Sequence, residues 1–215
     1  MILLAACLAH KGYGLYRRWS GVEDYDWSRH ALRCSRQEGD EMDGDRKYAF
    51  SWDLLGDIEL GRPNLGNTTR LEAYRLMQFC FRDVLEQRFG TQAADDVFYA
   101  AGKLAGAEFA AHLLGHPDDL GDFVAELQRV LREMGIGILR VEKADAEKGQ
   151  FVVTVSEDLD CSGLPETGES ICVYDEGFIA ALLESYTGRR FVVKEVDCWC
   201  TGDRTCRFAA EVAAA

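Results

Sequence analysis

The sequence has no apolar run approaching the roughly 20 residues that a helix needs to cross a bilayer, so we expect no transmembrane segment. It also has few basic side chains: 24 Lys and Arg stand against 37 Asp and Glu, for a formal net charge of -13. No Lys/Arg cluster with interleaved aromatic residues offsets this charge, which argues against direct binding of nucleic acid or of an anionic membrane surface. We therefore expect a soluble, cytoplasmic protein.

Recognisable catalytic motifs are missing as well. The sequence contains no nucleophile motif, no phosphate-cradling Gly-rich loop after a strand and no dinucleotide fingerprint. The acidic run Glu157-Asp158-Leu159-Asp160 could in principle serve acid–base chemistry, but runs of charge are usually solvated, and we interpret this one as an exposed loop. A non-enzymatic role is favoured over an enzymatic one.

The length of 215 residues and the hydrophobic content of 47% suit one domain with or without an extension. Residues 1–41 show no sustained periodicity, and their lipoprotein-like start lacks a basic n-region, so we expect a weakly ordered extension before a single domain over 42–215. An equal alternative is that translation begins at Met42. The codons for Gln37-Glu38-Gly39 can form a purine-rich ribosome-binding sequence just upstream of this methionine.

Apolar periodicity and turn residues predict the elements of the domain. Helices are expected at about 70–89, 92–114 and 118–134, and another after Cys172; strands are expected at 49–52, 136–141, 150–156, 191–198 and 206–208. Thr69 and Glu72 form a candidate capping box for the first helix. The second helix is rich in Gly and Ala, which permits close packing in the core or across a dimer contact. This order predicts an α+β fold, with an antiparallel sheet covered by helices.

Cysteines are concentrated near the C-terminal end, where Cys172, Cys198, Cys200 and Cys206 lie between expected elements. A hairpin over residues 191–208 would bring Cys198 and Cys206 together, with the helix that follows Cys172 alongside. Zinc takes about four such donors in a closed site, and Glu195 can supply a carboxylate. Strict alternation puts Glu195 and Cys198 on opposite faces, so their joint use needs a β-bulge or a strand end between them.

Other interpretations of these cysteines stay open. Free cysteines are commonly buried as small hydrophobes, and disulfides rank below a metal site because the sequence has no convincing export signal. The sequence does not decide whether Cys161 or Cys200 replaces one of the four proposed ligands.

The order Cys172, Gly177, Glu195-x-x-Cys198, Gly202 and Cys206-x-Phe208 resembles the 4-vinyl reductase domain family. This family includes bacteriochlorophyll-biosynthesis proteins and the sensory domains of phenol-responsive transcription activators. In the phenol-sensing members, three cysteines and one glutamate bind zinc. Carried over by motif, the resemblance implies a zinc site made by Cys172, Glu195, Cys198 and Cys206. Four protein ligands leave no position for water, so the implied zinc is structural.

The resemblance also implies a helix-flanked antiparallel sheet similar to that of TRAPP vesicle-tethering subunits, a homodimer formed through the first helices, and a buried pocket between sheet and helices. Our candidates for the pocket lining, for which ordinary core packing is the alternative, are Phe98, Tyr99, Phe109, His112, Phe123 and Phe151. In the phenol sensors a His and a Trp hold the phenol hydroxyl. Their nearest counterparts here, Phe123 and Phe151, cannot donate hydrogen bonds, which favours a more apolar or larger ligand.

These observations lead to three hypotheses about function. The first is a zinc-stabilised domain that senses or carries a hydrophobic or aromatic small molecule, with any regulation acting through a separate protein partner or the dimer. The second is an accessory role in tetrapyrrole (bacteriochlorophyll) vinyl reduction, which the family name suggests. The third is a protein-assembly module resembling the tethering subunits.

Overall fold

The computed structural model describes residues 47–115 and 117–213. The chain divides into two units, Met1–Ala49 and Phe50–Ala215, and every element described below belongs to the second. The expectations for residues 1–41 and for a start at Met42 concern positions outside the described residues.

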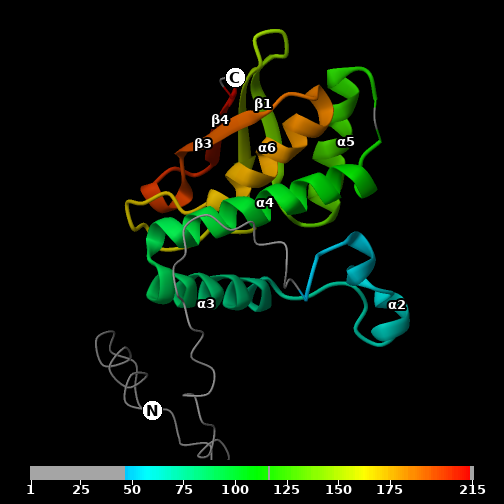
Figure 1. Cartoon of the computed structure of the whole chain (residues 1–215), viewed down its shortest axis with the longest axis vertical. Helices are drawn as coiled ribbons and strands as arrows, with labels where there is room; N and C mark the ends of the chain where they lie inside the picture. The colour runs from blue at the N-terminus through cyan, green and yellow to red at the C-terminus, as the bar shows by residue number, and fades with distance from the viewer. Residues whose placement is uncertain (1–46, 116, 214–215) are drawn as a thin grey trace, which may run out of the picture. The chain divides into compact units, whose positions relative to one another are not determined.

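The second unit contains four longer helices and four strands (Figure 1). The helices are α3 (Leu71–Phe89), α4 (Thr91–Leu113), α5 (Leu120–Glu133) and α6 (Val173–Thr187). The strands are β1 (Ile138–Asp145), β2 (Gln150–Ser156), β3 (Phe191–Asp197) and β4 (Cys206–Val212). They form one antiparallel sheet in the order β1-β2-β4-β3. The predicted α+β fold with a helix-covered antiparallel sheet is confirmed.

Two local predictions near the start of this unit are wrong. Residues 49–52 form no strand; a short 3-10 helix, η2 (Trp52–Leu55), begins there and α2 (Ile58–Gly61) follows it. The N-cap of α3 is Arg70 rather than Thr69, and the Arg70 side chain pairs with Glu72. Glu72 therefore bonds to a guanidinium, a partner that the capping-box pattern does not include.

The core lies between the sheet and the helices α5 and α6. Helix α5 has a strongly one-sided apolar face and buries Phe123, Leu127, Val130 and Leu131, which is why it packs flat on the neighbouring elements. Helix α6 is apolar on most of its surface because it is covered on two sides, by the sheet and by α4 (Figure 1).

Glycines allow α4 and α6 to approach closely. A Cβ atom added at Gly102 would overlap the carbonyl oxygen of Tyr174, and one added at Gly177 would overlap that of Tyr99. The small residues of α4 thus serve packing inside the domain. No helix in the ranges 47–115 and 117–213 is long and apolar enough to span a membrane.

Candidate metal centre and ligand cavity

Four buried cysteines meet at one end of the β3–β4 hairpin. The sulfur atoms of Cys161, Cys172, Cys198 and Cys206 all lie within 4.8 Å of one another. The Sγ atom of Cys172 is 3.9 Å from that of Cys198 and 4.0 Å from that of Cys206. Each of these residues is at most 1% exposed. We call this group the cysteine cluster.

The hairpin and the start of α6 position three of the four sulfurs. Strand β3 ends at Asp197 and β4 begins at Cys206, so Cys198 and Cys206 share one end of the antiparallel pair. The pairing of β3 with β4 shifts register between Glu195 and Asp197, which is the irregularity that joint use of Glu195 and Cys198 requires. Cys172 is the residue that immediately precedes α6.

Cys161 reaches the cluster from the loop that follows β2. The Oδ1 atom of Asp158 accepts hydrogen bonds from the backbone N–H groups of Asp160 (2.8 Å) and Cys161 (3.0 Å). This turn fixes the backbone, and the Sγ atom of Cys161 lies 3.0 Å from that of Cys206. Sequence spacing carries little sign of this contact, because Cys161 lies outside the hairpin that carries the motif.

Glu195 lies beside the cysteine cluster. Its Oε2 atom accepts a hydrogen bond from the backbone N–H of Cys172 at 3.2 Å, and its buried Oε1 atom has no partner within the described part of the chain. Burial and the negative charge of Cys198 raise the pKa of Glu195 to about 8. A buried carboxylate oxygen without a partner costs free energy, so this oxygen is available to a cation at the cluster.

The donor set suits a thiophilic divalent metal. A Zn–S bond of about 2.3 Å in a tetrahedral site places neighbouring sulfurs about 3.8 Å apart, close to the 3.9 and 4.0 Å found around Cys172. Hydrogen bonds from Cys161, Cys172 and Cys206 lower the pKa of Cys198, whereas bonding to Cys161 raises the pKa of Cys172. Adjacent thiolates repel one another, so ionising all of them requires a cation among them.

Cys200 is also buried, at 1% exposure, but it is not part of the cysteine cluster. It lies in η3 (Trp199–Thr201), and its backbone carbonyl accepts hydrogen bonds from Thr167 and Gly168. Burial raises the pKa of the Cys200 thiol to about 12. This cysteine has the features of a small core residue.

The acidic run after β2 is buried, so its interpretation as a solvated loop is wrong. Asp158 and Asp160 are each 4% exposed. From α3, Tyr74 donates a hydrogen bond to Oδ1 of Asp160 at 2.7 Å and Gln78 donates to Oδ2 at 2.8 Å. Composition does not reveal these partners, because they lie 86 and 82 residues earlier in the chain. Burial, reinforced by Asp160, raises the pKa of Asp158 to about 7.

An apolar cavity of about 60 Å³ lies between α5, α6 and the strands β1 and β2. Among its lining residues only Asp158 and Asp175 are not apolar. Phe123 and Phe151, two of the predicted lining residues, do line it. Phe109 is buried one layer further out, with its ring centroid 5.2 Å from that of Phe178, which lines the cavity.

The structure places the other predicted lining residues elsewhere. The ring of Phe98 packs against the Arg82 guanidinium on the α3 side of α4. Tyr99 lies at the α4–α6 contact, where its carbonyl faces Gly177. His112 stacks on Trp52 with 4.7 Å between ring centroids, near the end of α4. These three side chains are not among the residues that line the apolar cavity.

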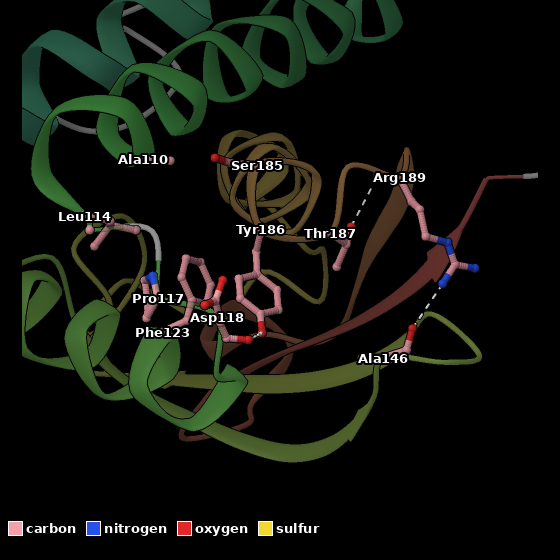
Figure 2. A pocket seen from close by; sticks show the side chains of 11 residues that line it. Ala110, Leu114, Pro117, Asp118, Phe123, Ala146, Ser185, Tyr186, Thr187 and Arg189 are labelled. Carbon is pink, nitrogen blue, oxygen red and sulfur yellow. Dashed lines mark hydrogen bonds between the residues drawn. The ribbon is translucent and has the colours of Figure 1, made fainter.

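A second, more open pocket of about 430 Å³ lies next to the apolar cavity, and Phe123 lines both (Figure 2). Figure 2 shows the rings of Phe123 and Tyr186 side by side; their centroids are 4.6 Å apart. The Tyr186 hydroxyl donates a hydrogen bond to the backbone carbonyl of Asp118 at 3.1 Å. The two stacked rings therefore stand between the surface pocket and the interior.

Comparison with known proteins agrees with this geometry. Residues 151–212 match the family model of the 4-vinyl reductase domain. An uncharacterized protein of Methanocaldococcus jannaschii is 28% identical over 148 residues, which are 69% of this chain and 79% of that protein.

Two solved structures share the fold. The phenol-responsive sensory domain of the transcription activator PoxR, determined with phenol, has a TM-score of 0.50 at 14% identity, and the match covers 67% of this chain and 75% of that one. A trafficking protein particle complex subunit 3 from Naegleria fowleri, covalently bound to palmitic acid, has a TM-score of 0.52 at 14% identity, covering 67% of this chain and 95% of that one.

The matched residues 151–212 contain Cys161, Cys172, Cys198 and Cys206, together with strands β2, β3 and β4 and helix α6. The resemblance drawn from the cysteine spacing is thereby confirmed. Over this segment the chain belongs to the 4-vinyl reductase domain family.

Proposed function

We propose that this chain is a zinc-stabilised domain that binds a hydrophobic or aromatic small molecule, as a sensor or carrier. The observation that supports this most is the apolar cavity between α5, α6 and the sheet. A well-packed core leaves few voids larger than a water molecule. An apolar cavity inside a ligand-binding fold is therefore a candidate ligand site.

Zinc is the proposed structural metal, and the cysteine cluster is its site. A bound zinc would supply the positive charge that lets the clustered thiols ionise, and it would tie the loop at Cys161, the start of α6 and the β3–β4 hairpin together. Cys172, Cys198 and Cys206 belong to the set carried over from the resemblance. For the fourth position the geometry favours Cys161, since its sulfur lies within 4.8 Å of the other three, while the resemblance assigns Glu195.

The size of the cavity favours a small ligand. Pockets that enclose drug-sized molecules measure about 300–1,000 Å³, whereas this cavity measures about 60 Å³. A single ring or a short chain suits it better than a tetrapyrrole. Rotation of Tyr186 and Phe123 would join the cavity to the open pocket of Figure 2, which we propose as the entrance.

We further propose that the domain is a homodimer formed through its first long helices. Apolar side chains at positions 77, 81 and 84 repeat at helical spacing along α3, and Met77 and Phe81 are 65% and 64% exposed. On α4, Val97 and Leu104 are each 47% exposed. Exposed apolar patches of this kind commonly mark protein interfaces. Signalling to a separate protein partner would then pass through the dimer or through the exposed surface of the domain.

Native mass spectrometry of the purified full-length chain tests these proposals together. We expect two chains per particle, one zinc per chain and a retained organic molecule of low mass. A retained porphyrin-type pigment would favour the accessory role in tetrapyrrole reduction instead. A metal-free particle that retains no molecule, and that gains neither zinc nor a small aromatic compound on titration, would contradict the binding proposal and favour a pure assembly module.

A further inference from the structure

Two carboxyl groups face the otherwise apolar cavity. Asp158 comes from the loop after β2 and Asp175 from the first turn of α6, and both line the cavity. One carboxylate oxygen of each lies within 4.8 Å of the other and of the Cys172 sulfur. The cavity thus has one polar end, located between its apolar walls and the cysteine cluster.

Folding accounts for one of these carboxyl groups but not for the other. Asp158 caps the turn that carries Cys161 to the cysteine cluster. The Oδ2 atom of Asp175, in contrast, is buried and has no hydrogen-bond partner among the described residues. The neighbouring Glu176 shows the usual solution for a buried acid, because it accepts hydrogen bonds from Lys194 and from the backbone of Glu195. An orphaned buried oxygen that is not needed for packing points to a missing donor.

We propose that the ligand has an apolar body and one hydrogen-bond-donating head, a hydroxyl or an amine, which donates to Asp175 and Asp158. This inference rests on the proposed ligand-binding function and specifies the class of compound. The apolar walls accept the body of the ligand, and its head satisfies the unpartnered Oδ2 atom of Asp175. A carboxylate-bearing ligand is excluded from this orientation, because two carboxyl groups already face the space that its head would fill.

The aromatic residues of the cavity agree with this polarity. Phe123 and Phe151 line the cavity and offer no hydrogen bond to a ligand. The polar contact is instead supplied in the opposite chemical sense: the protein accepts, and the ligand donates. A ligand bound there would contact Asp158, which shapes the turn leading to Cys161, so its head would lie next to the element that completes the cysteine cluster.

Four compounds with the same ring and different heads test the inference. Toluene has no polar head, aniline and phenol donate hydrogen bonds, and benzoate carries a carboxylate. Isothermal titration calorimetry of the zinc-loaded full-length protein should give aniline and phenol Kd values at least about tenfold below that of toluene, which corresponds to about 1.4 kcal/mol. Benzoate should show no binding.

An Asp175→Leu variant should remove this preference and leave toluene binding in place, with zinc content measured to show that the cluster is intact. Equal affinities for toluene, phenol and aniline in the wild-type protein would overturn the inference while leaving the apolar binding site standing, and this result does not depend on whether the variant folds. Failure of all four compounds to bind would contradict the proposed function itself. Binding of a second metal ion per chain that Asp175→Leu abolishes would also overturn the inference, since the unpaired oxygen would then be a metal ligand.

Discussion

The sulfur atoms of Cys161 and Cys206 lie 3.0 Å apart, although the two residues are separated by 45 positions in the chain. One comes from the loop after β2 and the other from the first residue of β4. Their contact closes a cluster in which a metal ion would join three separate segments of the domain. Metal binding and folding should therefore be strongly coupled.

The first prediction concerns the ligands of this cluster. Cys206→Ser and Cys161→Ser should each lower the zinc content well below one per chain, because each removes a thiolate from a closed four-donor site. Elemental analysis of the purified variants measures this directly. Cys200→Ser is the matched control, since Cys200 is equally buried but lies outside the cluster, and Cys80→Ser is an exposed control.

Glu195→Gln distinguishes the two candidates for the fourth position. It keeps the shape of the side chain and removes a carboxylate oxygen that can bind a cation. Full zinc content in Glu195→Gln, with loss in Cys161→Ser, identifies a four-cysteine site. The reverse pattern would assign the fourth position to Glu195, as the resemblance implies, and would contradict the geometric argument for Cys161.

A second prediction concerns the contact between α4 and α6. Gly102→Ala should destabilise the domain by about 1–3 kcal/mol, the usual cost of overpacking, because the new Cβ overlaps the Tyr174 carbonyl on the rigid backbone of α6. For a chain of this size that corresponds to a fall in Tm of about 2–4 °C per kcal/mol. Gly61→Ala is the control, since nothing lies within 4 Å of a Cβ added there. Equal Tm values for the two variants would contradict the close-packing interpretation.

The fold can be predicted from the sequence because its elements have strong local signals. The helices α3, α4 and α5 have clear apolar periodicity and stop near Gly90 and Gly135, so their predicted ranges match the observed ones within one or two residues. The β3–β4 hairpin follows from a β-branched run and a polar turn. The strand predicted at 49–52 is wrong because a short apolar stretch carries no period that separates a strand from a 3-10 turn.

Parts of the site that depend on tertiary contacts cannot be predicted in this way. Asp158 and Asp160 have the composition of an exposed loop, and only the distant side chains of Tyr74 and Gln78 make the burial of Asp160 favourable. Asp175 carries no sequence signal at all, because an acid in the first turn of a helix is ordinary.

Aromatic character is only a partial guide to the cavity. It places Phe123 and Phe151 in the lining, where the structure has them. The same character places Phe98 there, although the Phe98 ring packs on Arg82. Which face of α4 turns toward the sheet depends on its packing against α6, and the sequence of α4 alone does not specify that choice.

The third prediction is that zinc reverses the pH dependence of stability. Burial raises the pKa of Asp158 to about 7 and that of Glu195 to about 8 in the metal-free chain. Their pKa values are lower when unfolded, so the native state binds more protons between about pH 4 and 8, and the free energy of unfolding falls as pH rises through this range. Zinc-bound thiolates bind fewer protons than the unfolded thiols, so the loaded protein should become more stable as pH rises toward about 8.

Urea denaturation at several pH values, with and without a chelator, checks the two slopes. The metal-free slope should become shallower in Asp158→Asn, which removes one of the titrating groups. Parallel slopes for the loaded and metal-free protein would show that zinc, if it binds, is not held by ionised thiols of the cluster.

The last prediction is that the exposed face of α3 holds two copies of the chain together. Met77 and Phe81 lie one helical turn apart and are 65% and 64% exposed, so a charge at both positions should separate the copies by placing carboxylates in an apolar contact. Met77→Glu/Phe81→Glu should elute as a monomer in size-exclusion chromatography with light scattering, where the wild type is a dimer. Val192→Glu, on the exposed face of β3, should remain dimeric. A double variant that stays dimeric with an unchanged Tm would place the interface elsewhere.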